Sequence, residues 1–272
     1  MWAFYLPYLV SLHHLEKKTS TNRALLLIYT TVFIKCLYNG YEYITTTLLM
    51  MVTPYIHYWW VEGWNFKYLV KQLLIVGTTA MISVLSTTII LAAQISAVKG
   101  GLKAGLHHIF IYSVGKRTHG DAGSYPEVYA NSLKADVITV VKKYLEGFIF
   151  DFNQMLGGSS QDLNVKYQTV IVVFAFISCL VWLFHFLFQW GKLPLTEDSI
   201  RKLTALSIAV WFSLLAPLSW MVIFKGHSYI HTHMNFITWH MPFTLLGFGL
   251  LGAFLSMLVA IIYNHIINKV RS

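Results

Sequence analysis

The strongest constraint on this chain is a series of long apolar runs bounded by basic residues. A helix needs roughly 20 apolar residues to cross a hydrocarbon core about 30 Å thick. The runs of about that length or longer are Tyr68–Val98, Thr169–Trp190, Leu203–Phe224 and Ile237–Tyr263. Hydrophobic residues make up 56% of the 272 residues and charged residues only 11%, which is too little charge to cover a soluble globule of this size. The sequence therefore predicts an all-α integral membrane protein.

Shorter apolar segments near the N-terminus add to this set. Residues 1–12 are apolar but short, and HHLEKKTSTNR follows as an expected basic connector. Two runs, Ala24–Leu37 and Ile44–Ile56, are joined by YNGYEY and predict a short helical hairpin over 24–56 with a polar tip. We therefore expect about six to seven membrane helices. The two cysteines lie in apolar runs, so no disulfide framework is expected.

The chain divides into three parts along the sequence. Residues 1–98 form membrane helices, and residues 99–166 form a more polar segment. Residues 167–272 hold three further membrane helices and a histidine-rich loop at 225–237.

The distribution of lysine and arginine predicts the orientation, because short cytoplasmic loops are enriched in both. If HHLEKKTSTNR is cytoplasmic, that side holds Lys17, Lys18, Arg23, Lys67, Lys71, Lys192, Arg201, Lys202, Lys269 and Arg271. The opposite short loops hold only Lys35 and Lys225. YNGYEY, the 99–166 segment and the 225–237 loop then all lie on the exoplasmic face, where their polar residues converge. The net charge of +9 is explained by helix ends and membrane lipids, and no nucleic-acid partner is expected.

The 99–166 segment carries two features of interest. A helix is expected around Glu127–Leu156, because one face is apolar at helical spacing. That face comprises Val137, Val141, Tyr144, Leu145, Phe148 and Phe152. Such a helix lies in the membrane interface, either as a structural lid or as a gate for substrate.

The second feature is GKRTHGD at residues 115–121. Lys116 and Arg117 stand beside a flexible turn and are suited to a lipid phosphate, or equally to headgroup anchoring. Asp121 either orders the loop through Arg117 or acts as a base.

Glu42 stands at the tip of the hairpin, close to the membrane boundary. A carboxylate there is costly unless it is paired, and one reading is a structural ion pair with Lys35. The alternative is a polar cavity, in which the nearby Tyr38, Tyr41 and Tyr43 offer hydroxyls and ring faces for a sugar or a headgroup.

FKGHSYIHTHMNFITWH, residues 224–240, interrupts an otherwise apolar third of the chain. His227 and His231 have the spacing of a metal-binding pair, but a third ligand is unclear, so no metal is assigned. Interfacial histidines bonded to the backbone and headgroups are a second reading. The reading we favour uses His227, His231, His233, Lys225 and Asn235 as donors to an anionic, lipid-linked substrate.

These residues also carry a resemblance. LAPLSWMVIFKGHSYIHTHMNFITWHMPF, together with YNGYEYITT and GKRTHGD, resembles the later half of bacterial membrane glycosyltransferases of the C-type fold. Members of that family resemble dolichyl-phosphate-mannose-type mannosyltransferases and take sugars from polyprenyl-phosphate donors. The resemblance implies a bacterial inner (plasma) membrane location, a polyprenyl-phosphate partner, a sugar acceptor and no cofactor. It places Lys116, Arg117, Lys225 and His227 near the donor phosphate, and Glu42, His231, His233 and Asn235 nearer the sugar.

One departure from the family pattern matters. C-type enzymes carry a catalytic carboxylate in the first exoplasmic loop, and this chain has no such long loop near its start. Three explanations are open. The sequence is a portion of a longer enzyme, which would fit the abrupt apolar start; a partner subunit supplies the base; or the chain is a noncatalytic relative that needs no base. Within this sequence, Glu42 and Asp121 are the substitutes for the missing base.

Two other classes stay open at this stage. One is a noncatalytic structural subunit of a larger membrane complex. The other is a membrane protein whose histidines ligate a metal, haem or pigment.

Overall fold

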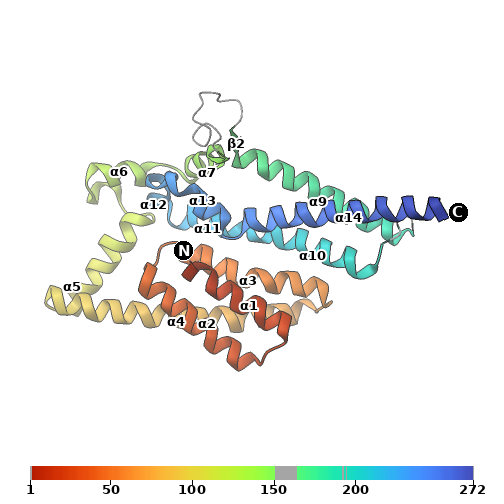
Figure 1. Cartoon of the computed structure of the whole chain (residues 1–272). Helices are drawn as coiled ribbons and strands as arrows, with labels where there is room; N and C mark the ends of the chain where they lie inside the picture. The colour runs from red at the N-terminus through yellow and green to blue at the C-terminus, as the bar shows by residue number, and fades with distance from the viewer. Residues whose placement is uncertain (1, 151–163, 192, 194, 272) are drawn as a thin grey trace.

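A computed structural model describes residues 2–150, 164–191, 193 and 195–271, and most of them are helical (Figure 1). The N-terminal helices are α1 Trp2–Lys17, α2 Thr21–Asn39, α3 Ile44–Val61 and α4 Phe66–Lys99. The middle of the chain forms α5 Leu102–His107, η1 His108–Val114, η2 Gly115–Arg117, η3 Ala122–Ser124, α6 Glu127–Lys134, α7 Val137–Glu146, β1 Phe148–Phe150 and β2 Val165–Lys166. The last part forms α9 Tyr167–Gln189, α10 Glu197–Ser213, α11 Leu215–Ile223, α12 Lys225–Ile230, η5 Thr232–Met234, α13 Asn235–His240 and α14 Phe243–Arg271.

Four of the described helical stretches are long and apolar enough to cross a membrane. They are Phe66–Lys99, Tyr167–Gln189, Glu197–Ile223 and Phe243–Asn264. The prediction of an all-α membrane protein is therefore confirmed. The larger count of six to seven membrane helices stays a prediction, because α1, α2 and α3, which are 16, 19 and 18 residues long, are not among these four stretches.

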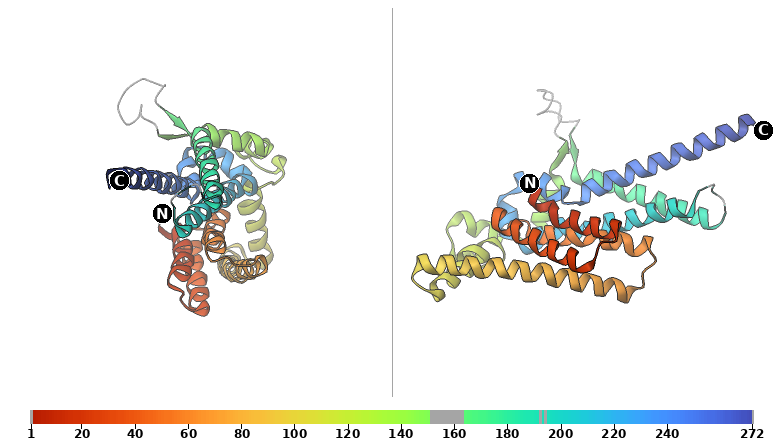
Figure 2. Two further views of the ribbon diagram at one scale, coloured as in Figure 1. Left: turned by 90° about the vertical axis from the view of Figure 1, so that its right-hand side faces the viewer. Right: turned by 60° about the horizontal axis from the view of Figure 1, so that its bottom comes forward.

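The N-terminal helices form a four-helix group in which α1 and α4 each pack against both α2 and α3 (Figure 2). The predicted hairpin helices and their connecting turn are present. The two arms nevertheless pack mainly against other helices: α2 against α4 and α1, and α3 against α1, α10 and α11. The pair therefore does not stand as a separate hairpin. The expected connector after residue 12 begins too early, because α1 continues through His13 and His14 to Lys17.

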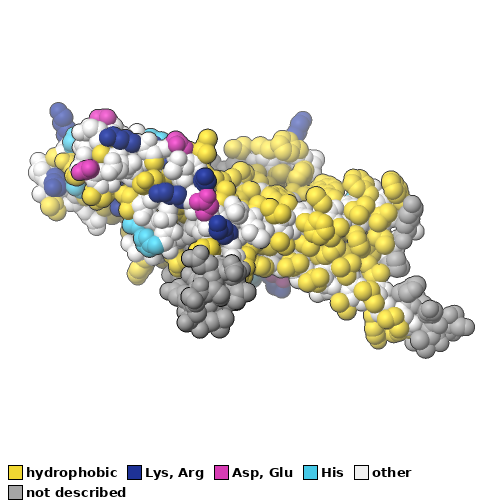
Figure 3. Space-filling model, turned by 90° about the horizontal axis from the view of Figure 1, so that it is seen from above, with side chains coloured by type: hydrophobic (Ala, Val, Ile, Leu, Met, Phe, Trp, Pro, Cys, Tyr) yellow, Lys and Arg dark blue, Asp and Glu magenta, His cyan; other side chains and the backbone are white. Residues whose placement is uncertain are grey.

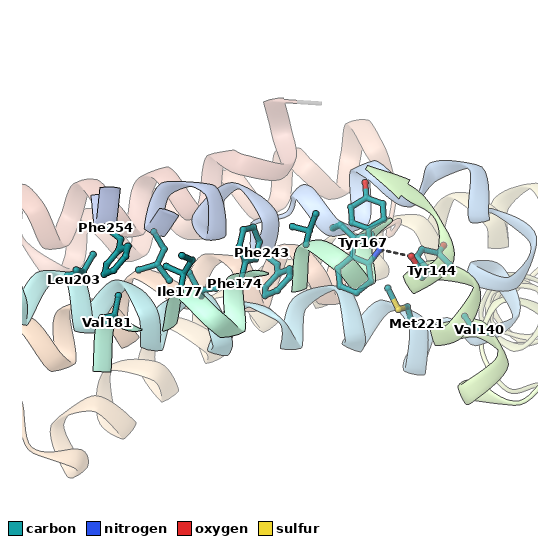
Figure 4. Packing of buried hydrophobic residues seen from close by; sticks show 14 residues of the cluster. Val140, Tyr144, Tyr167, Phe174, Ile177, Val181, Leu203, Met221, Phe243 and Phe254 are labelled. Carbon is teal, nitrogen blue, oxygen red and sulfur yellow. Dashed lines mark hydrogen bonds between the residues drawn. The ribbon is translucent and has the colours of Figure 1, made fainter. Parts of the chain in front are cut away.

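The C-terminal helices join this group through α10. This helix packs against α3 on one side and against α9 and α14 on the other, and Thr46 of α3 donates a hydrogen bond to Ala216 O of α11 over 3.1 Å. A buried apolar cluster runs along α9, α10 and α14 from Phe254 to Tyr144 of α7 (Figure 4). The first and third parts of the sequence therefore share one bundle.

The described residues of the 99–166 segment, 99–150 and 164–166, cover one end of the bundle. We call this end, formed by α5–α7, η1–η3, α12, η5 and α13, the polar end. Figure 3 shows the molecule from above. Charged and histidine side chains gather at the polar end, whereas hydrophobic side chains cover much of the remaining visible surface. Apolar surface of this kind suits a bilayer.

The prediction of a single amphipathic helix over Glu127–Leu156 is wrong in its extent, because two shorter helices, α6 and α7, occupy the first part of that range. Asp136 interrupts it, because its side chain caps a new helix by accepting the Thr139 N–H over 2.7 Å, and α7 then ends at Glu146. Phe148 begins β1, which pairs antiparallel with β2, and Phe152 lies outside the described residues. The amphipathic character of α7 is confirmed, since Val140 and Tyr144 are fully buried against the bundle.

Candidate functional site

Three segments far apart in the sequence meet at the polar end. They are the α2–α3 turn with Glu42, η2 with Arg117, and α12 with His227. The His227 Nε2 lies 3.5 Å from the Glu42 Oε1, and Arg117 lines two cavities together with Glu42. These contacts confirm that the three predicted polar clusters come together in space, whereas their position on the exoplasmic face stays a prediction.

The two cavities adjoin one another and have different character. One measures about 260 Å³ and is mainly apolar, with Ile44, Trp220 and Phe224 in its wall. The other measures about 360 Å³ and is more polar. Both are lined by Tyr41, Glu42, Leu91 and Arg117, so a carboxylate, a guanidinium and a phenol stand where the apolar and polar spaces meet.

The turn that carries Glu42 is held from below by Lys35. The Lys35 Nζ donates to Gly40 O over 2.9 Å and to Glu42 O over 2.5 Å, and it lies 5.4 Å from the Phe4 ring centroid. The predicted Lys35–Glu42 ion pair is not among the ion pairs of the described residues. Lys35 binds the Glu42 backbone carbonyl instead, and Glu42 lines the two cavities. Two residues of the turn have positive φ, Gly40 at 58° and Tyr43 at 53°.

Of the three tyrosines predicted to offer ring faces, only Tyr41 lines a described cavity. Tyr43 is buried, with its ring 4.4 Å from that of Trp220, and Tyr38 is 82% exposed. The Tyr41 hydroxyl donates to Thr87 over 3.2 Å and accepts from Thr88 over 3.1 Å. These two threonines fix the phenol at the cavity wall.

The 115–121 loop is pressed against α11 and α12. The Gly226 N–H donates to Thr118 O over 3.3 Å, and the His119 ring nitrogen lies 2.8 Å from Val222 O. A Cβ on Gly226 would lie 2.9 Å from Lys116 O, so glycine is needed for this close approach. Arg117 is thereby held at the cavity by backbone contacts on both sides of it.

His227 is neutral at pH 7 in this setting. Burial, followed by the nearby His231, Arg117 and Lys116, lowers its pKa from 6.5 to about 4. The His227 and His231 ring centroids lie 4.2 Å apart. The His231 and His233 ring centroids lie 5.4 Å apart. Burial and His233 also lower the pKa of His231. The contact with Glu42 is therefore a polar contact between a neutral ring and a carboxylate.

The remaining predicted site residues have structural contacts. Lys225 is buried and donates to Leu133 O over 2.6 Å, which ties α12 to α6. Asn235 donates to Tyr144 O over 3.3 Å, which ties α13 to α7. Asp121 accepts from Gly123 N and from the Ser124 hydroxyl, and Lys116 lies 4.8 Å from the Tyr129 ring centroid.

Sequence reasoning missed the contribution of α4 to the site. Thr88 and Leu91 line the apolar cavity, and Thr87 and Gln94 line the polar one. The signal was present as polar residues, Thr87, Thr88 and Gln94, inside a long apolar run. In the described part of the chain, no group of three His, Cys, Asp or Glu residues is arranged to hold a metal ion.

Comparison with protein-family models, with curated proteins and with solved structures finds no match.

Proposed function

We propose that this chain is a glycosyltransferase-like membrane protein that binds a polyprenyl-phosphate-linked sugar at the polar end. The observation that carries the proposal is the pair of adjoining cavities with Arg117 and Glu42 at their junction. The apolar cavity suits the first isoprene units, Arg117 suits the phosphate, and the polar cavity suits the sugar. An arginine binds phosphate through a planar fork of donors.

The chemistry assigned to Glu42 is that of a general base. In the proposed transfer, the acceptor hydroxyl oxygen forms a bond to the anomeric carbon of the sugar. The bond from that carbon to the phosphate oxygen breaks, and the lipid phosphate leaves with the electron pair. Glu42 takes the hydroxyl proton, while Arg117 compensates the negative charge of the leaving phosphate.

The contacts of the other residues narrow their roles. Neutral His227 donates a hydrogen bond to the Glu42 carboxylate, or donates to or accepts from a sugar hydroxyl, without adding a buried charge. Lys225, Asn235 and Asp121 hold the 99–166 segment in place through the contacts described above. The bacterial inner membrane, an exoplasmic site and a partner subunit remain part of the proposal.

The proposal is tested by binding of a polyprenyl-phosphate sugar analogue to the purified chain. Arg117→Gln is expected to weaken binding by about 10- to 100-fold, the range for loss of a charge-assisted hydrogen bond. Arg23→Gln is the matched control, because Arg23 is exposed near the start of α2. Equal binding by the wild type and Arg117→Gln would contradict the proposal that Arg117 binds the lipid phosphate.

Glu42→Gln separates binding from transfer. The variant keeps the size and polarity of the side chain but cannot accept the proton, so binding is expected to persist while sugar transfer falls at least about 100-fold. Full transfer activity in Glu42→Gln would exclude this carboxylate as the base. Binding without transfer in the wild type would support a noncatalytic carrier of the same ligand.

A further inference from the structure

A separate basic cavity lies where α4 reverses direction into α5. Its volume is about 610 Å³, and its lining includes Lys99, Lys103, His107, His108 and Tyr112. It shares no lining residue with the two cavities around Glu42 and Arg117. The proposed glycosyl transfer makes no use of it.

Glycines build this corner. Gly100 and Gly101 have φ values of 82° and 145°, a backbone conformation that residues with a Cβ rarely adopt. A Cβ on Gly105 would lie 2.3 Å from the Ser96 Oγ and 2.9 Å from the Ser96 backbone nitrogen. These glycines let α5 fold back along the end of α4, which brings both lysines to one cavity.

The cavity is positively charged and unneutralised within the described chain. No acidic residue is among its lining residues, and the ion pairs found among the described residues involve neither Lys99 nor Lys103. His108 and Tyr112 stack with their ring centroids 5.3 Å apart and form a planar wall. Two lysines with no carboxylate beside them favour an anionic ligand.

Exposed apolar side chains flank these cations. Val98 is 84% exposed, Leu102 63% and Phe110 60%. Cationic side chains next to exposed apolar ones are typical of a segment that lies in the membrane interface. The length of α4 agrees with an interfacial position for the corner. With 34 residues, the helix is about 51 Å long and exceeds the hydrocarbon thickness, so its end reaches beyond the apolar core.

We propose that the α4–α5 corner binds the headgroup of an anionic phospholipid. Lys99 and Lys103 contact the phosphate, the histidine and tyrosine rings border the headgroup, and the acyl chains lie against the exposed apolar side chains. The ligand chemistry is a phosphate ester attached to an apolar tail. This site is independent of the proposed transferase function.

The test uses the full chain in nanodiscs that contain a photoactivatable phosphatidylglycerol, followed by mapping of the labelled peptides. In the wild type, labelling is expected to concentrate in residues 99–112. Lys99→Gln/Lys103→Gln is expected to reduce that labelling by about 30-fold, as expected for two lysines near an anionic surface. Lys99→Arg/Lys103→Arg is expected to retain it, which separates loss of charge from misfolding.

Lys67→Gln/Lys71→Gln is the matched control. It removes two lysines, also four residues apart, from the other end of α4, and labelling of residues 99–112 is expected to persist. Equal labelling by a photoactivatable phosphatidylcholine would overturn the proposal, because the site would then not select for net charge. Displacement by millimolar glycerol phosphate would overturn the lipid as ligand and assign the corner to a soluble phosphate ester.

Discussion

Lys35 shows how one buried charge shapes the site. Its side chain is fully buried, and a buried ammonium is costly unless its donors are satisfied. The Gly40 and Glu42 carbonyls accept two of its hydrogen bonds. The sequence placed Lys35 and Glu42 together, but it gave no sign that the partner is the backbone, because carbonyl positions depend on the turn conformation.

Lys35→Met is expected to lower the free energy of unfolding by about 2 kcal/mol or more. The change leaves the two carbonyls of the turn without their donor. Thermal unfolding of the purified chain measures the loss, with Lys142→Met as control, because the Lys142 side chain is 74% exposed. Equal melting temperatures for Lys35→Met and the wild type would show that the hydrogen bonds from Lys35 to the Gly40 and Glu42 carbonyls add nothing to stability.

His227 makes stability depend on pH in a defined direction. Its pKa is lowered from 6.5 to about 4 in the folded chain, so the unfolded chain binds more protons between those values. The stabilisation is present above about pH 6.5 and is lost as pH falls toward 4. The difference in melting temperature between pH 7 and pH 4.5 is therefore expected to be smaller in His227→Gln. An unchanged difference would contradict the lowered pKa.

At the scale of elements, the sequence predicts the long apolar helices but not the places where shorter helices end. The four long helices follow from runs of apolar residues, and the amphipathic face of α7 follows from its spacing. The break between α6 and α7 depends on a single capping side chain, Asp136, and β1 pairs with a strand that follows residues 151–163. Long, periodic patterns outweigh such local signals in a sequence.

The contact between α12 and the 115–121 loop depends on Gly226. Gly226→Val is expected to destabilise the chain by about 1–3 kcal/mol, because its side chain meets Lys116 O and Leu133. It should also weaken binding of the polyprenyl-phosphate analogue, since Arg117 is displaced. Gly249→Ala is the control, since nothing lies within 4 Å of its added Cβ. A Gly226→Val chain with wild-type stability and affinity would contradict the close packing.

At the scale of the whole molecule, the site depends on which segments reach the same end. The bias of basic residues placed Glu42, Arg117 and His227 on one face. The fold brings Glu42 and Arg117 to one pair of cavities and places the His227 ring against the Glu42 carboxylate. Lys225, Asn235 and Asp121 reach the same end but hold backbone and loop contacts. A sequence shows that polar residues gather, whereas only packing shows which of them face open space.

The most direct test of the account is a cryo-electron microscopy structure of the full chain in nanodiscs with a bound polyprenyl phosphate. We expect phosphate density beside Arg117, within reach of Glu42, with the isoprenoid chain along Trp220 and Phe224. Phosphate density at another place in the molecule, or an α2–α3 turn separated from α12, would contradict it.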